Sequence, residues 1–145
     1  MLAGTSVAIE RPRSFLAPYG WGTLGPAVPM AIGGKLAAPD RPVLALAGDG
    51  GLLFTVAELG TAVALKLGLP VVVGDNDGYG EIRDYFDRAS APRLGTEVVT
   101  HDLLGVAAGL GCATATASTP DELAEGISTA LRQTRPTVIR VRQGD

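Results

Sequence analysis

Two glycine-rich turns, each preceded by a short apolar run, constrain the fold of this chain more than any other feature. The first run, 43–47, leads into Gly48-Asp49-Gly50-Gly51, and the second run, 71–73, leads into Asp75-Asn76-Asp77-Gly78. Short apolar runs that end in turn residues are typical of buried strands in a parallel sheet. Because ligands bind beyond the carboxyl ends of such strands, we expect the two turns to face one binding site.

Helical and strand-like segments alternate along most of the chain. Helices are expected at 29–37, 56–67, 81–86, 102–109 and 120–133, and strands at 43–47, 71–74, 112–116 and 137–141. This alternation predicts a single α/β domain, in which helices flank both faces of a parallel sheet. The opening segment, 4–25, is rich in glycine and proline and has no strand before it, so residues 1–145 are expected to form a domain truncated at its N-terminus.

Two of the expected helices begin with a capping-box pattern, in which Ser or Thr is followed three residues later by Glu or Gln. Thr55 with Glu58 and Thr119 with Glu122 both fit. Pro120 also suits the first position of a helix, where an N–H group has no partner to lose. We expect the amino end of the helix that starts near Thr55 to face an anion bound at the first turn.

Composition excludes several classes of function. The net charge is −3, with only two lysines, so the chain lacks the basic surface that nucleic-acid binding requires. No apolar run is long enough to cross a bilayer, and the first residues do not look like an export signal. Cys112 is the only cysteine, which excludes an internal disulfide and favours a reducing compartment. These features predict a cytoplasmic domain that acts on small molecules, without a nucleic-acid or membrane partner.

The residue types in the two turns suit a hard cation. Mg²⁺ prefers six oxygen ligands, commonly one or two carboxylates with neutral oxygens, waters and phosphate oxygens. Asp49 offers a carboxylate, Asn76 an amide oxygen and Gly78 a backbone carbonyl oxygen. The glycines beside Asp49 let the backbone approach a phosphate group closely. The sequence therefore predicts a Mg²⁺ ion that carries a diphosphate-containing cofactor.

The same residues fit other kinds of site less well. Asp49 by itself is equally typical of an ordinary turn or helix cap, and only its pairing with Asn76 favours a ligand. The first turn does not have the Gly-x-Gly-x-x-Gly pattern of nicotinamide or flavin folds, and the chain has no P-loop. A receiver domain also places carboxylates at strand ends, but it needs a lysine after a later strand. Lys35 and Lys66 both lie in expected helices.

The whole pattern resembles the signature of thiamine diphosphate enzymes, in which Gly-Asp-Gly is followed by a spacer of just under thirty residues and an Asn-containing turn. Asp49 and Asn76 are 27 positions apart. Residues 22–33 resemble the block before this motif in acetolactate synthase and the 2-oxo acid decarboxylases, and 38–43 and 77–80 are similar as well. The resemblance covers nearly the whole chain. It is to the diphosphate-binding catalytic domain, usually the last of three.

This resemblance implies thiamine diphosphate and Mg²⁺ as cofactors. Leu24 would lie under the cofactor and force its two rings into a bent shape, and the Gly22 carbonyl would accept a hydrogen bond from the aminopyrimidine ring. The metal ligands would be Asp49, Asn76 and Gly78. The implied cofactor-binding residues are Gly22, Thr23, Leu24, Gly48, Asp49, Gly50, Gly51, Asn76, Gly78, Tyr79 and Gly80.

The resemblance also implies a reaction and partners. The expected protein is a 2-oxo acid decarboxylase or an acetolactate-synthase-like carboligase; the alternative is an isolated or truncated cofactor-binding domain without activity of its own. No catalytic residue is assigned: the position of the catalytic glutamate of pyruvate-decarboxylase-like enzymes is Ile82, one place after Glu81. The glutamate that activates the cofactor is expected on a separate pyrimidine-binding domain or subunit.

Two further expectations follow. Asp75 stands where many relatives have Asn, and it is expected to lie near the metal without binding it. A domain that closes its cofactor against a partner exposes apolar surface when alone, here around Trp21, Leu24 and Leu53. A homo-oligomer, or dependence on the pyrimidine-binding partner, is therefore expected.

Overall fold

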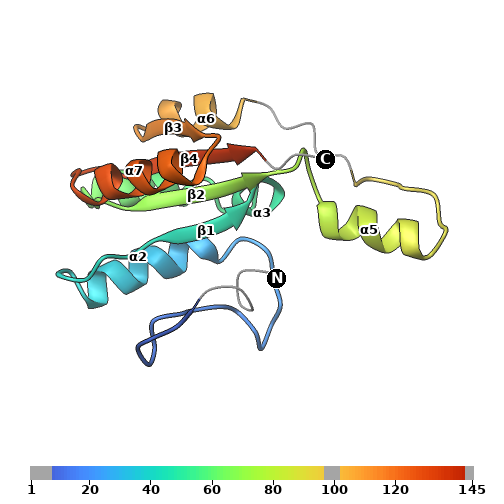
Figure 1. Cartoon of the computed structure of the whole chain (residues 1–145), viewed down its shortest axis with the longest axis horizontal. Helices are drawn as coiled ribbons and strands as arrows, with labels where there is room; N and C mark the ends of the chain where they lie inside the picture. The colour runs from blue at the N-terminus through green and yellow to red at the C-terminus, as the bar shows by residue number, and fades with distance from the viewer. Residues whose placement is uncertain (1–7, 97–101, 143–145) are drawn as a thin grey trace.

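The computed structural model describes residues 8–96 and 102–142. Its centre is a four-stranded parallel sheet in the order β1-β2-β4-β3. The strands are β1 (Ala45–Gly48), β2 (Pro70–Asp75), β3 (Ala113–Ala117) and β4 (Thr137–Arg142). Figure 1 shows helices on both faces of this sheet. The expected single α/β domain with a parallel sheet is therefore confirmed.

The described residues form six helices, and Figure 1 labels all of them except α4. They are α2 (Ala27–Ala37), α3 (Asp49–Leu53), α4 (Glu58–Ala64), α5 (Gly80–Arg88), α6 (Leu103–Gly109) and α7 (Pro120–Leu131). The expected bounds agree to within two residues for most elements. Pro29 does not open α2, which begins two residues earlier, but it lies in the first turn, where a missing N–H group is tolerated.

The region between β1 and β2 differs from the expectation. A short helix, α3, follows β1 directly, and α4 begins only at Glu58, with Ala57 as a cap residue that makes no side-chain bond. The predicted capping box at Thr55 is therefore wrong. The Thr55 hydroxyl group instead donates to the carbonyl oxygen of Gly25, at 2.6 Å, and ties α3 to the loop before α2. The helix whose amino end lies at the first turn is α3.

The second predicted capping box is confirmed. Thr119 Oγ1 accepts a hydrogen bond from the backbone N–H of Glu122 at 3.2 Å. Glu122 Oε2 in turn accepts from the N–H of Ser118 at 2.7 Å, one residue before the cap. Pro120 occupies the start of α7, as expected. Local capping chemistry alone was enough to place this helix.

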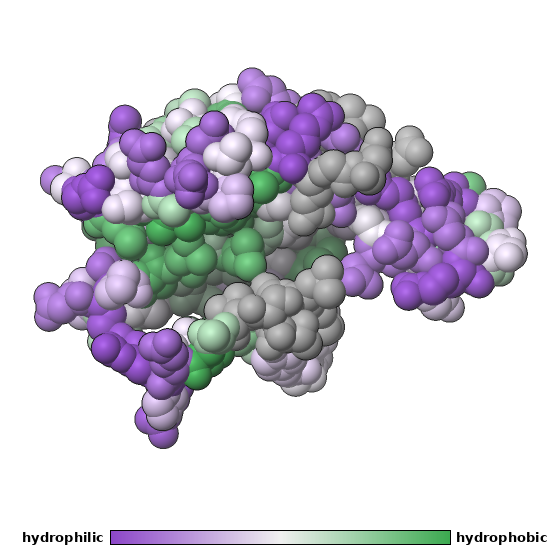
Figure 2. Space-filling model, viewed as in Figure 1, coloured by the Kyte–Doolittle hydropathy of each residue, from purple (hydrophilic) through white to green (hydrophobic). Residues whose placement is uncertain are grey.

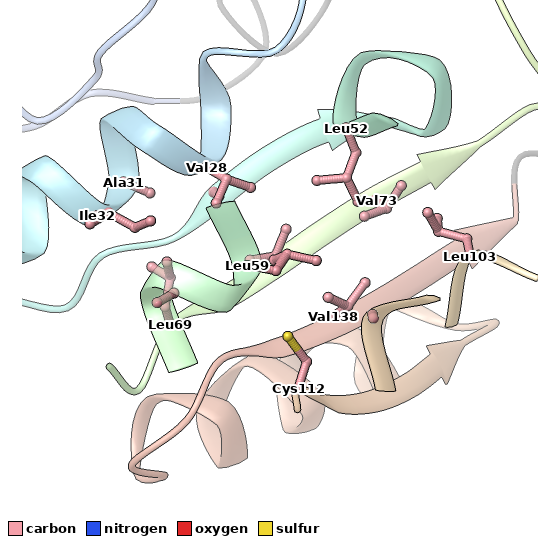
Figure 3. Close-up of a cluster of buried hydrophobic side chains, with 14 residues drawn as sticks. Val28, Ala31, Ile32, Leu52, Leu59, Leu69, Val73, Leu103, Cys112 and Val138 are labelled. Carbon is pink, nitrogen blue, oxygen red and sulfur yellow. The ribbon is translucent and has the colours of Figure 1, made fainter. Parts of the chain in front are cut away.

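The larger part of the core lies on the sheet face covered by α2, α4 and α6. Val71 and Val73 of β2 and Val138 of β4 pack there with buried residues of the three helices. Figure 3 shows Val28 of α2 and Leu59 of α4 directed into this cluster. The opposite face, with Val72 and Ile139, is covered by α7, because successive side chains of a strand point to opposite faces.

Part of the α7 face is left uncovered at the edge strand β1. The side chain of Leu46, which pairs in register with Val72, is 47% exposed, and Leu44 just before the strand is 44% exposed. Figure 2 shows an apolar area on this side of the molecule, between the polar surfaces of α7 and of the segment near the N-terminus. Among the described residues, no helix is both long and apolar enough to cross a membrane.

Candidate metal centre

The two glycine-rich turns meet at the carboxyl ends of neighbouring strands. β1 and β2 pair in parallel with Gly48 opposite Gly74, so Asp49 and the turn 75–78 emerge side by side. Asp49 is the first residue of α3, and its side chain is 1% exposed. Its Oδ2 atom accepts a hydrogen bond from the N–H of Gly78 at 2.7 Å, which joins the two turns directly.

Three oxygen-bearing groups converge in this space. The Asn76 side-chain amide lies 2.9 Å from the carbonyl oxygen of Gly78 and 3.3 Å from Asp49 Oδ1. With its nitrogen turned toward these two oxygens, the amide donates to both. With its oxygen turned toward them, three oxygens face one another without a proton between them, which is the arrangement that a hard cation stabilises. The residues present therefore fit a cation such as Mg²⁺.

The ligand set of this centre is poor in charged side chains. The described residues contain no group of three or more His, Cys, Asp or Glu side chains that could hold a metal ion. The converging groups are one carboxylate, one amide and one backbone carbonyl. Such a set is typical of Mg²⁺ sites in which substrate or cofactor phosphates supply further oxygens, rather than of a zinc site.

Burial and charge both act on the Asp49 carboxyl group. Loss of solvation raises its pKa, hydrogen bonds from the N–H groups of Gly50 and Gly78 oppose that rise, and the nearby charge of Asp75 adds to it. The ionised form is thus disfavoured in the chain alone. A cation bound at Asp49 would relieve this cost, because it replaces the lost solvation of the carboxylate.

The other two acidic side chains of the second turn are held by arginines of β4. Asp75 Oδ2 lies 3.2 Å from Arg140 Nε, and Asp75 Oδ1 accepts from the N–H of Asp77 at 3.2 Å. Asp77 Oδ2 lies 3.4 Å from Arg142 Nη2. Asp75 thus braces the turn, while Asp49, Asn76 and Gly78 are the groups that converge.

Two glycines are required by close packing. A Cβ atom on Gly50 would lie 2.8 Å from the Tyr79 ring, and one on Gly80 would lie 2.3 Å from the Asn76 amide nitrogen. Gly48 and Gly51 are different, since the nearest atoms to a Cβ there are 3.9 Å away. A Cβ atom at Gly48 or Gly51 would therefore make only ordinary van der Waals contacts, and close packing does not require glycine at either position.

The loop that precedes α2 lies beside α3. Gly22 has a φ of +65°, and its N–H donates to the carbonyl oxygen of Pro18 at 2.7 Å. The Thr23 hydroxyl group donates to the carbonyl oxygen of Leu24. Leu24 is 46% exposed, and its Cδ2 atom lies 3.9 Å from the position of a Cβ on Gly51. The structure therefore brings Leu24 next to the first turn.

Sequence reasoning missed two side chains at this site. Phe54, just after α3, is 60% exposed and contacts the Tyr79 ring edge-on, with 6.3 Å between the ring centroids. Arg83, on α5, is the second: its guanidinium group donates to two carbonyl oxygens of the second turn. No sequence motif marks either contact.

Comparison with known proteins identifies the family. The family described as "Thiamine pyrophosphate enzyme, C-terminal TPP binding domain" matches residues 1–141. The chain belongs to this family. The recognition of a thiamine diphosphate-binding domain is thereby confirmed, as is thiamine diphosphate as the cofactor, with which such enzymes typically use Mg²⁺.

Several relatives of this thiamine diphosphate-binding domain are larger enzymes. It is 39% identical to the probable 2-ketoarginine decarboxylase AruI of Pseudomonas aeruginosa over 136 residues, which are 93% of this chain and 24% of that protein. It is 29% identical to acetolactate synthase isozyme 2 large subunit of Escherichia coli over 143 residues, 97% of this chain and 26% of that protein. The chain spans about a quarter of the length of these relatives.

A solved structure shows the same fold. The thiamine diphosphate-dependent 4-hydroxybenzoylformate decarboxylase of Rhodococcus jostii RHA1 superposes with a TM-score of 0.76 at 30% sequence identity. The superposition covers 83% of this chain and 23% of that one. The expected thiamine diphosphate-binding fold is thus confirmed.

Proposed function

We propose that this chain supplies the diphosphate- and Mg²⁺-binding half of the active site of an enzyme that acts on 2-oxo acids. The observation that carries the proposal is the convergence of Asp49, Asn76 and the Gly78 carbonyl at the carboxyl ends of β1 and β2. A parallel sheet places ligands at this edge, and the chain belongs to a thiamine pyrophosphate-binding family.

Each part of the site has a role in the proposal. Asp49, Asn76 and Gly78 hold Mg²⁺, and the backbone at Gly48 and Gly51, which carries no side chain, lets the diphosphate approach. The loop 22–24 supports the ring system, with Leu24 as its apolar contact. Tyr79 and Gly80 shape one side of the metal centre. Tyr79 packs on Gly50, and Gly80 leaves room for the Asn76 amide. When bound, the cofactor supplies an electron sink for breaking a carbon–carbon bond next to a carbonyl group.

The substrate class is proposed from the names of the relatives, and the partners from the family resemblance of the two turns. Two of them are named as decarboxylases of 2-oxo acids and one as an acetolactate synthase. The proposed reaction is therefore decarboxylation of a 2-oxo acid, alone or followed by joining the product to a second carbonyl compound. A pyrimidine-binding domain or subunit supplies the activating glutamate, and a homo-oligomer brings it into place. The proposed location is the cytoplasm, where the buried Cys112 stays reduced.

One observation favours the second candidate, a cofactor-binding domain without activity of its own. The groups that converge at the described site are a metal-binding set, and none of them is suited to move a proton in the reaction. Ile82, at the position of the catalytic glutamate in pyruvate-decarboxylase-like enzymes, is 43% exposed on α5. Under this candidate the chain binds the cofactor but turns over no 2-oxo acid without its partner.

Calorimetry tests the binding proposal. Thiamine diphosphate is titrated into the full chain with Mg²⁺ and with a chelator, and the titration is repeated for Asp49→Ala. Binding is expected only with Mg²⁺ and is expected to vanish in Asp49→Ala. The control Asp40→Ala removes an exposed loop carboxylate and keeps binding intact. Equal affinity with and without a divalent ion would contradict the proposal.

The reaction is tested separately. The chain is mixed with a pyrimidine-binding partner, and carbon dioxide release and products are followed over a panel of 2-oxo acids. Turnover only in the mixture supports the proposed enzyme. Binding without turnover of any 2-oxo acid, with the partner glutamate present, overturns the reaction class.

A further inference from the structure

Arg83 binds the backbone of the turn that carries Asn76 and Gly78. It is the fourth residue of α5, and its guanidinium group reaches back to the turn before the helix. Its Nη1 atom donates to the carbonyl oxygen of Asp77 at 2.9 Å, and its Nη2 atom donates to the carbonyl oxygen of Asn76. The rigid fork of an arginine side chain thus spans two consecutive peptide groups.

Both of these peptide groups are held at their other end as well. The N–H of Asp77, in the same peptide group as the Asn76 carbonyl, donates to Asp75 Oδ1 at 3.2 Å. The N–H of Gly78, in the same peptide group as the Asp77 carbonyl, donates to Asp49 Oδ2 at 2.7 Å. One peptide is therefore fixed between Arg83 and Asp75, and the next between Arg83 and Asp49.

The backbone held in this way has an unusual conformation. Asp77 has a φ of +57°, in the left-handed region that residues with a Cβ atom rarely adopt, and Gly78 has a φ of +133°. The carbonyls of Asn76 and Asp77 consequently face Arg83, and the Gly78 carbonyl faces the Asn76 amide at 2.9 Å. The carbonyls of Asn76 and Asp77 therefore accept hydrogen bonds from Arg83, whereas the Gly78 carbonyl lies at the metal centre beside the Asn76 amide.

We infer that Arg83 is a positioning residue, which selects the Gly78 carbonyl as a cation ligand by fixing the two peptides before it. The inference rests on the proposed function, because it concerns the same metal centre. Removal of the Arg83 guanidinium group is expected to change cation affinity in the direction opposite to a pure charge effect. A positive charge near a cation site repels the cation, so removal of that charge alone would tighten cation binding. Loss of the hydrogen bonds from Arg83 to the turn would instead weaken cation binding.

The experiment measures Mn²⁺ binding to the full chain in the presence of thiamine diphosphate, from the electron paramagnetic resonance signal of free Mn²⁺. Arg83→Gln is expected to weaken Mn²⁺ binding by about 10–100-fold, the usual effect of losing an outer partner of a metal ligand. Arg83→Lys is expected to fall between wild type and Arg83→Gln, because an ammonium group keeps the charge but lacks the fork.

Arg88→Gln is the matched control. Arg88 lies on the same helix and is exposed, and its Nε atom donates to the carbonyl oxygen of Asp84 within that helix. The control loses the same charge without a bond to the turn, so Mn²⁺ affinity is expected to stay equal or to rise slightly. Unchanged or tighter Mn²⁺ binding in Arg83→Gln would overturn the inference.

Amide hydrogen exchange in the metal-free chain gives a second readout. Arg83→Gln is expected to speed exchange at the N–H groups of Asp77 and Gly78, and Arg88→Gln is expected to leave it unchanged. If wild type binds no Mn²⁺, the proposed function fails and the ligand-selecting role fails with it, while the exchange data still decide whether Arg83 fixes the turn. Equal exchange in Arg83→Gln and wild type would overturn that part too.

Discussion

Asp49 shows how function and stability oppose each other at a single residue. Its carboxyl group is buried, it lies near the charge of Asp75, and its pKa is raised mainly by the loss of solvation. A group whose pKa is raised on folding stabilises the fold at low pH, and this stabilisation is lost as the pH rises through the folded-state pKa. Wherever the pH is high enough to ionise Asp49, its buried charge therefore destabilises the metal-free chain.

Replacement of this carboxylate is expected to separate stability from metal binding. Asp49→Asn should raise the free energy of unfolding of the metal-free chain at pH 7, on the order of 1 kcal/mol, because it removes a buried charge whose lost solvation its hydrogen bonds offset only in part. The gain should shrink as the pH is lowered, since wild-type Asp49 then becomes neutral as well. Urea denaturation of both proteins across this pH range measures it. A loss of stability in Asp49→Asn at pH 7 would contradict the account.

Gly80 is the second residue at which the packing makes a strong prediction. A Cβ atom there would lie 2.3 Å from the Asn76 amide nitrogen, so Gly80→Ala should displace the amide and weaken Mg²⁺-dependent cofactor binding at least about tenfold. Gly33→Ala is the control, because Gly33 lies in α2 with no atom near its Cβ position. That control should stabilise the chain slightly and keep binding, as Ala favours helix more than Gly. Calorimetry with thiamine diphosphate and Mg²⁺ compares the two variants, and equal binding in both would be evidence against the packing argument.

At the scale of elements, most of the fold could be predicted because the apolar runs, the alternation of segments and the cap at Thr119 were unambiguous. The two turns could be brought together in advance, since parallel strands end at the same edge. The failures have physical causes. Thr55 has a capping pattern, but its hydroxyl group is used in a contact to Gly25, thirty residues away in the chain. Arg83 could not be placed, because its bonds depend on how α5 leaves the turn.

The contrast between the two threonines can be measured. Asp is as good a helix cap as Thr, but an ionised Asp has no proton to donate. Thr119→Asp, at a true cap, should therefore leave the free energy of unfolding nearly unchanged. Thr55→Asp should lower it by at least about 1 kcal/mol, because a carboxylate then faces the carbonyl oxygen of Gly25. Chemical denaturation of both variants tests this, and tolerance of Asp at residue 55 would restore the capping interpretation.

At the scale of the whole molecule, large apolar side chains remain exposed around the site. Trp21 is 87% exposed, Phe54 60% and Leu24 46%, whereas Leu53 packs partly against the core. Of the three expected residues, Trp21 and Leu24 are exposed and Leu53 is partly buried, while its neighbour Phe54 is exposed. Apolar patches of this kind mark protein interfaces.

The chain alone is therefore expected to self-associate. Trp21→Ser and Phe54→Ser should each lower the mean mass in light scattering at high concentration, because they remove apolar area at the site. Leu65→Ser is the control, since Leu65 is 45% exposed but follows α4 at the opposite end of the sheet. A monomeric wild-type chain at high concentration, or an equal effect of Leu65→Ser, would count against an interface at the site.

The central claim is that Asp49, Asn76 and Gly78 hold a divalent cation that carries a diphosphate. The most direct measurement is pulsed electron paramagnetic resonance of Mn²⁺, which favours the same oxygen ligands as Mg²⁺, bound to the full chain with thiamine diphosphate. The account predicts phosphorus hyperfine couplings from a coordinated diphosphate in the wild-type chain and their loss in Asp49→Ala at equal concentrations. Protein-bound Mn²⁺ without phosphorus couplings, or the same couplings in Asp49→Ala, would contradict it.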